Sequence, residues 1–193
     1  MPPTDRREQL LDAALTVINR DGYGGVSIEA IAREADVSRP VIYGVFDGLG
    51  DLLGALLDRQ EERALRQLTA ALPAAPGDQD PDEFLVGAVR SLVDAVVGDP
   101  DTWRPILLPP DGTPEAVRAR VDRDRERVRE QLEGLLRWGL ARRGGPPDLD
   151  LELASHALLA VAERWGRLVL SEPEEFSGER LAAFVRKLLG ELS

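Results

Sequence analysis

Apolar residues recur every three or four positions along most of this chain, which is the spacing of amphipathic helices. No segment combines a sustained apolar–polar alternation with β-branched residues, the pattern typical of a half-buried strand. Clusters of glycine and proline separate the helical stretches, and such clusters end helices and favour turns. We therefore expect an all-α fold with helices over these ranges: 6–20, two short helices within 27–46, 49–72, 82–97, 113–141, 149–170 and 177–192.

Residues 27–46, with the sequence SIEAIAREADVSRPVIYGVF, have the spacing of two helices joined by a sharp turn. The apolar positions that would face inward are Ile31, Ala35, Val37, Ile42 and Val45. Ala32 is small enough to let the second helix approach the first, and Asp36 begins the break between them. Ser38 is a good N-cap, and Pro40 fits the first turn of the second helix, where a missing N–H costs nothing. A helix of this length can enter a major groove and present its first residues to base edges.

The segments on either side of this motif complete a characteristic order of elements. The helix over 6–20 ends in residues 21–25, whose glycines tolerate positive φ. The motif itself ends in a Tyr-x-x-Phe sequence at Phe46, and a turn at residues 47–48 and a helix with paired leucines follow it. This order resembles the N-terminal region of the tetracycline-repressor (TetR) family of transcription factors, and the resemblance covers about the first quarter of the chain.

The resemblance implies an N-terminal three-helix helix-turn-helix DNA-binding domain over residues 1–48. A C-terminal helical bundle for ligand binding and dimerisation would then occupy residues 49–193. In this family the last two long helices form the dimer interface, which here would be 149–170 and 177–192. Two recognition helices would meet successive major grooves of a palindromic operator, about 34 Å apart. We expect a homodimeric regulator of double-stranded DNA, specifically a repressor, released when an unknown small molecule favours another conformer.

Candidate DNA contacts lie mainly on the second motif helix. Arg39 is the only charged residue of that helix, and it can read guanine through two hydrogen bonds or bind a phosphate instead. The hydroxyls of Ser38 and Tyr43 suit phosphate contacts, and TetR-like proteins use these two motif positions in that way. Ser27 can cap the first motif helix or face a phosphate, and Val41 can contact a thymine methyl. The complete predicted DNA-binding set is Ser27, Ser38, Arg39, Pro40, Val41, Tyr43 and Gly44.

Three positions depart from the family pattern. Leu49 stands where a lysine usually begins the next helix and contacts phosphate. Gly44 replaces a residue that is often larger and polar. Asp36 replaces a frequent turn glycine, although aspartate tolerates the left-handed conformation. We therefore expect DNA binding that is weaker than in typical relatives but not lost.

The ligand pocket can only be nominated, from large or polar-tipped residues beyond residue 50. These residues, each of which is also a reasonable core residue, are Phe84, Trp103, Trp138, His156 and Trp165. A lone histidine on an apolar helix is more often a hydrogen-bonded core residue than a metal ligand or a base. The charged run RARVDRDRERVRE over 118–130 alternates acids with arginines. We interpret it as a solvated helix face with pairs such as Arg118–Asp122, and not as a nucleic-acid patch.

The charge balance weakens the expectation of non-specific DNA binding. The chain has a formal net charge of −11, and residues 1–50 contain five arginines against eight carboxylates, a formal charge of −3. A basic surface is the usual mark of a nucleic-acid-binding protein. We expect weak non-specific affinity and a modest salt dependence, with specificity carried by local geometry. The alternative that this balance favours is a helical ligand-binding or protein-interaction module whose DNA-binding end has decayed.

The remaining composition argues against other classes. The chain has no cysteine and one histidine, and it shows no glycine-rich phosphate loop and no metal-ligand spacing. An enzyme, a metal or a cofactor is therefore not expected. The charged N-terminus does not fit a signal peptide, and no apolar run approaches the roughly 20 residues that span a bilayer. We expect a cytoplasmic protein without a membrane partner.

Overall fold

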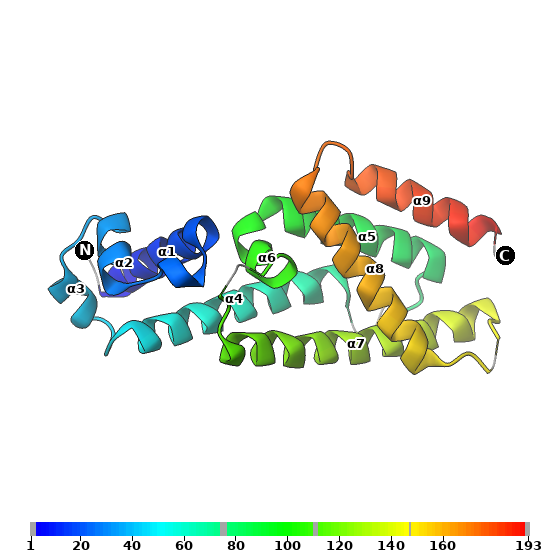
Figure 1. The fold of residues 1–193 in the computed structure, drawn as a ribbon. Coiled ribbons are helices and arrows are strands. Elements are labelled where there is room, and N and C mark those ends of the chain that lie inside the picture. The colour runs from blue at the N-terminus through cyan, green and yellow to red at the C-terminus, as the bar shows by residue number, and fades with distance from the viewer. Residues whose placement is uncertain (1–2, 74–76, 110–111, 147, 192–193) are drawn as a thin grey trace. The chain divides into compact units, whose positions relative to one another are not determined.

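The computed structural model describes residues 3–73, 77–109, 112–146 and 148–191. In these ranges every regular element is a helix, which confirms the predicted all-α fold (Figure 1). Three predicted loops include residues 74–76, 110–111 and 147, which lie outside the described ranges. In chain order the elements are α1 (Pro3–Asp21), η1 (Tyr23–Gly25), α2 (Ile28–Glu34), α3 (Arg39–Tyr43), α4 (Leu49–Ala71), α5 (Pro81–Gly98), α6 (Pro100–Leu107), α7 (Glu115–Arg143), α8 (Leu151–Ser171) and α9 (Gly178–Glu191).

Capping residues explain where several of these helices begin. The side chain of Asp80 accepts hydrogen bonds of 3.0 Å from the backbone N–H groups of Asp82 and Glu83 at the start of α5. Asp150 accepts one of 3.0 Å from the N–H of Leu153 at the start of α8. Each carboxylate satisfies backbone donors that have no partner within the helix. α6 lies between the predicted helices over 82–97 and 113–141, in a stretch where no helix is predicted from the sequence.

The helices form two compact units. The first unit combines Met1–Ala64 with Asp101–Ala119, and the second combines Leu65–Pro100 with Arg120–Ser193. Both units therefore contain residues of α4 and of α7. The functional boundary at residue 48 remains a prediction, because compactness alone does not show which segment binds DNA.

The core of the first unit is built from α1, α2, α3 and the first turns of α4. Ile31 and Ile42 are fully buried in it, and Ala35 is 6% exposed, which agrees with the inner positions predicted for the motif. Val37 and Val45 are half-buried and pack against the same core. Burying an isoleucine side chain contributes roughly 1.5–3 kcal/mol, so these contacts hold α2 and α3 in place. The fully buried large side chains of this core are Leu10, Leu11, Ile18, Ile31, Ile42 and Leu52.

In the second unit, α5 packs against α8 and α9. Val86 of α5 joins Ala182 and Val185 of α9 in one buried cluster, and Trp165 of α8 packs against it. A second cluster joins the end of α4 to α5 and α7, and its buried members are Ala71, Leu72, Ala88, Leu132 and Leu135.

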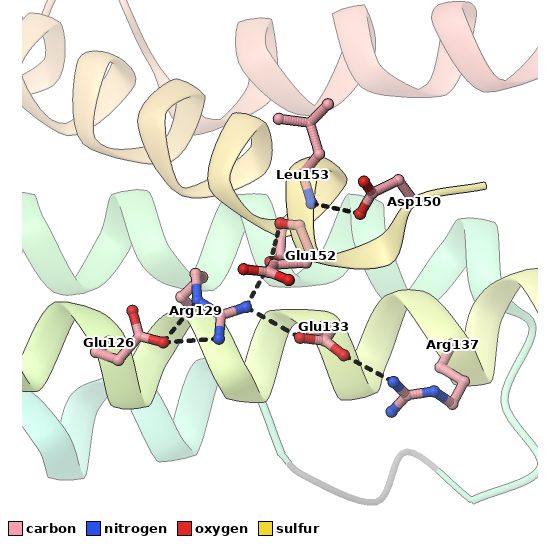
Figure 2. Close-up of polar contacts among 8 residues, drawn as sticks. Glu126, Arg129, Glu133, Arg137, Asp150, Glu152 and Leu153 are labelled. Atoms are coloured by element: carbon pink, nitrogen blue, oxygen red, sulfur yellow. Dashed lines mark hydrogen bonds and ion pairs between the residues drawn. The ribbon is translucent and has the colours of Figure 1, made fainter.

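The charged run of α7 is less solvated than predicted. Arg129 is 8% exposed, and Figure 2 shows its guanidinium enclosed by acceptors from α7 and α8. Its Nε and Nη2 donate to Oε1 of Glu126 at 2.8 and 2.7 Å. Its Nη1 donates at 3.0 Å both to Oε2 of Glu133 and to the hydroxyl of Ser155, which is fully buried. These hydrogen bonds lower the pKa of both glutamates, because they favour the ionised carboxylates.

The ion pairs of this run also differ in detail from the predicted ones. Asp122 pairs with Arg125 at 2.9 Å, three positions later, and Arg118 donates to the backbone oxygen of Thr113. Arg125 further pairs with Glu163 of α8 at 2.6 Å. The predicted Arg118–Asp122 pair is therefore wrong, since each residue has a different partner. Two arginines of the run, Arg125 and Arg129, connect α7 to α8 instead of facing solvent.

Candidate nucleic-acid interface

The turn between α2 and α3 is fixed by backbone hydrogen bonds of the Schellman type. The N–H of Val37 donates to the oxygen of Ala32 at 2.9 Å, and the N–H of Asp36 donates to the oxygen of Arg33 at 3.3 Å. Asp36 has a φ of 52° and is the one non-glycine residue with positive φ among those described. The side-chain amide of Gln9 on α1 donates to the oxygen of Ala35 at 2.9 Å. These bonds fix the direction in which α3 leaves the turn.

Ser27 is the N-cap of α2. Its hydroxyl oxygen accepts a hydrogen bond of 3.1 Å from the N–H of Ala30, and its backbone oxygen accepts one of 3.0 Å from Ile31. The predicted capping role of Ser27 is therefore confirmed. Because a hydroxyl that accepts can still donate, this cap leaves the predicted phosphate contact open.

α3 presents most of its surface outward. Ser38 is its N-cap residue by position, and its hydroxyl makes no capping hydrogen bond. Ile42 is the buried residue of the helix, and Tyr43 is 59% exposed. Val41 is half-buried, and the remaining predicted contacts on or beside α3 are exposed: Ser38, Arg39, Pro40 and Gly44.

The guanidinium of Arg39 forms an ion pair across the motif. Its Nη1 lies 2.8 Å from Oε1 of Glu29, in the first turn of α2, and both side chains are 62% exposed. The hydrogen bond from Arg39 lowers the pKa of the Glu29 carboxyl, so the carboxylate is ionised at neutral pH. Sequence reasoning singled out Arg39 but missed Glu29. The signal that could have found it is the position of Glu29 at the start of the helix that precedes the turn.

A second arginine near the motif is also paired with carboxylates. Arg20, at the end of α1, contacts Asp21 at 2.9 Å and Glu34 of α2 at 2.6 Å. The hydrogen bond from Arg20 lowers the pKa of Asp21. Arg39 in the motif and Arg20 beside it are therefore both balanced by nearby carboxylates, in agreement with the acidic composition of this part of the chain.

The structure gives a reason for one departure from the family pattern, Leu49, and none for another, Gly44. Leu49 begins α4 and is partly buried against the core of the first unit, so it contributes packing where a lysine would offer a charge. Gly44 ends α3 with a φ of −76°, and an added Cβ would meet only ordinary contacts of 3.5 and 3.6 Å. A larger residue could therefore occupy position 44 without backbone strain.

The five nominated pocket residues fall in both units. Trp103 belongs to the first unit and is 5% exposed, whereas the other four belong to the second unit. Phe84 and Trp138 form an edge-to-face pair with ring centroids 5.4 Å apart, and Trp165 instead pairs with Phe184 at 6.1 Å. His156 is exposed, so its interpretation as a core histidine is wrong. Which residues line a ligand site remains a prediction.

Two further observations concern the part of the chain that the structure describes. It contains no group of three or more histidine, aspartate or glutamate residues placed to hold a metal ion. Among its helices, none has the length and apolar character required to cross a bilayer.

The segment that carries this interface matches a known family. Residues 10–56 fit the family described as bacterial regulatory proteins, tetR family. The uncharacterized HTH-type transcriptional regulator Rv0472c of Mycobacterium tuberculosis (strain ATCC 25618 / H37Rv) is 30% identical over 125 residues, which cover 64% of this chain and 50% of that protein. The chain thus spans about half the length of this curated relative.

Solved structures extend the similarity to both units. A TetR-like transcriptional regulator from Rhodococcus sp. RHA1 matches with a TM-score of 0.78 and 26% identity, covering 97% of this chain and 95% of that one. FadR from Bacillus subtilis, in complex with stearoyl-CoA, matches with a TM-score of 0.71 and 20% identity, covering 94% and 96%. The second likeness concerns the fold alone.

Proposed function

Because this chain belongs to the TetR family of transcriptional regulators, we propose that it binds a palindromic DNA operator as a homodimer, represses transcription and is released by a small molecule. Members of this family are regulators and not enzymes, so the family assignment excludes the enzyme alternative. The observation that carries the proposal is the outward-facing surface of α3, held on a hydrogen-bonded turn. In this role the protein acts on the chromosome, in the cytoplasm.

Each exposed side chain of the motif has a role that suits its chemistry. Arg39 reads a guanine, since a guanidinium can donate two hydrogen bonds to O6 and N7. Ser38 and Tyr43 hold phosphates through their hydroxyls, and Ser27 adds a third hydroxyl from the start of α2. Val41, with Pro40 and Gly44, forms the small apolar surface of α3, which suits contact with a thymine methyl.

The C-terminal helices support the homodimer. Leu153 and Val161 of α8 are 67% and 42% exposed, and Phe184 and Leu188 of α9 are 56% and 48% exposed. Large exposed apolar side chains on these two helices favour burial against a partner. A two-fold axis through this face would bring two helices from each protomer into a four-helix interface.

A small molecule would act by selecting a conformer. It would bind the second unit and favour an arrangement in which the two recognition helices no longer match successive major grooves. The structure of Bacillus subtilis FadR with stearoyl-CoA makes a long-chain acyl-CoA a reasonable first probe for this chain. A probe that saturates the protein without changing operator affinity would not be the effector.

Selection from a randomised duplex library tests the DNA-binding proposal. The purified protein should recover one short, roughly palindromic sequence at physiological salt. Arg39→Ala should lower the preference for that sequence over scrambled DNA by at least about fivefold, because a bidentate base contact is worth about 1–3 kcal/mol. Fluorescence anisotropy with both duplexes measures this preference.

The matched control is Arg137→Ala, which removes an arginine from the exposed face of the second unit, where the side chain is 63% exposed. It should leave the preference unchanged. Recovery of no sequence above background, even at low salt, would contradict the proposal. That outcome would favour the module with a decayed DNA-binding end, which the local pairing of Arg20 and Arg39 with carboxylates makes the second candidate.

A further inference from the structure

We propose that Glu29 is a positioning residue that directs Arg39 toward a base and away from the phosphate backbone. The inference rests on the proposed function, since it concerns how the same interface distinguishes one sequence from another. Glu29 lies on α2 and Arg39 on α3, and their ion pair is a side-chain link between the two helices of the motif.

The geometry of the pair leaves two nitrogens of the Arg39 guanidinium available for a base. Glu29 engages Nη1 alone, through Oε1 at 2.8 Å. Nε and Nη2 of Arg39 have no partner within the described residues. Those two nitrogens form the side-on fork of a guanidinium, and a fork of two parallel N–H groups can bind O6 and N7 of guanine. Arg39 can therefore keep its bond to Glu29 while it reads a base.

The pair also reduces the freedom of a mobile side chain. An arginine side chain loses rotamer entropy when it is fixed, and Arg39 is 62% exposed, so little else restrains it. Glu29 holds the guanidinium in one orientation before DNA arrives. A carboxylate beside the guanidinium also repels phosphates, which disfavours the sequence-independent contact that Arg39 could otherwise make.

The acidic character of the motif fits this role. Residues 1–50 carry a formal charge of −3, so general attraction to phosphates is weak and cannot hold the protein on arbitrary DNA. A carboxylate that costs non-specific affinity while it orients a base-reading arginine increases the ratio of specific to non-specific binding. That ratio, more than affinity alone, determines whether a regulator finds its operator.

Glu29→Gln tests the proposal, because it keeps the size of the side chain and removes its charge. The preference for the operator over scrambled DNA should fall about three- to tenfold. The loss should be confined to the base pair at which Arg39→Ala also relaxes the preference, measured with duplexes substituted at each position in turn. In an Arg39→Ala background, Glu29→Gln should cause no further loss at that base pair.

The matched control is Glu34→Gln, which removes one carboxylate from the other ion pair of the motif, with Arg20. Both variants should bind scrambled DNA somewhat more tightly, because each removes one negative charge. If Glu29→Gln strengthened binding to all duplexes equally, as the control is expected to do, the positioning role would be overturned. The proposed function would stand in that case, provided that the wild-type protein selects an operator. A wild-type protein that selects no sequence would overturn both proposals.

Discussion

At the scale of single residues, Arg129 shows how a charged side chain can become part of a helical core. It lies three residues before the buried Leu132 on the same face of α7, so the packing that buries Leu132 also buries its guanidinium. Three acceptors make the burial tolerable: one oxygen of Glu126, one of Glu133 and the hydroxyl of Ser155. That hydroxyl in turn donates to the backbone oxygen of Glu152, and Figure 2 shows the carboxylates around the guanidinium. A buried charge is stable only when it is paired in this way.

Replacing Arg129 by alanine should lower the melting temperature at neutral pH by several degrees, because the hydroxyl of Ser155 and two carboxylates lose their partner. The difference from wild type should shrink in acid. Arg129 holds the pKa of Glu126 and Glu133 below their ordinary value of 4.5, so this contribution is present above that pH and is lost as the pH falls through the lowered values.

Thermal unfolding followed by circular dichroism between pH 3 and pH 7 measures both effects. The control is Arg137→Ala, whose side chain is 63% exposed although it also pairs with Glu133. It should change the melting temperature much less, since exposed pairs contribute little. An Arg129→Ala difference that stays constant down to pH 3 would contradict the assigned role of the two glutamates.

At the scale of elements, the helix-turn-helix was predictable because its determinants are local. The cap at Ser27, the left-handed turn at Asp36 and the buried positions Ile31 and Ile42 all lie within 16 residues, and the structure confirms each. The contact between α7 and α8 was not predictable, because Arg125 pairs with Glu163, which is 38 residues away in the sequence. Periodicity identifies which arginines share a face with apolar residues, but not which helix will cover that face.

The turn predicts opposite changes in stability for two substitutions of Asp36. Asp36 adopts a φ of 52°, where most residues other than glycine pay about 1–2 kcal/mol. Asp36→Gly should therefore stabilise the protein by about 0.5–1 kcal/mol, although the greater freedom of glycine in the unfolded chain offsets part of the gain. Asp36→Val should destabilise it by about 1–2 kcal/mol, because a β-branched side chain fits this conformation poorly.

Urea titration of the two variants measures both changes. The comparison needs no external control, since the two substitutions are made at one position and differ in sign. A stabilising Asp36→Val would contradict the conformational strain assigned to this position. An Asp36→Gly variant less stable than wild type would show that the side chain of Asp36 contributes more than its backbone conformation costs.

At the scale of the whole molecule, the sequence was informative about the order of helices and uninformative about what their aromatic residues do. Nomination by residue type grouped Trp103 with Trp165, which belong to different units. It also passed over Phe184, which forms an edge-to-face pair with Trp165 and is nevertheless 56% exposed. Exposure is a property of how helices are packed together, so no local pattern could distinguish these cases.

That exposed face yields the last prediction. Leu153→Glu should convert a dimer to a monomer, because a two-fold axis places the new carboxylate in the interface twice, where burial without a partner is costly. Leu153 is 67% exposed in the single chain, so the fold itself should survive the change. Light scattering after gel filtration measures the mass. The control is Val97→Glu on α5, where the side chain is 52% exposed outside α8 and α9, and it should remain dimeric.

A Leu153→Glu protein that keeps the dimer mass would place the interface elsewhere. A monomer that still binds a complete palindrome with wild-type affinity would show that dimerisation does not set the half-site spacing, since each subunit would then contribute its recognition helix independently.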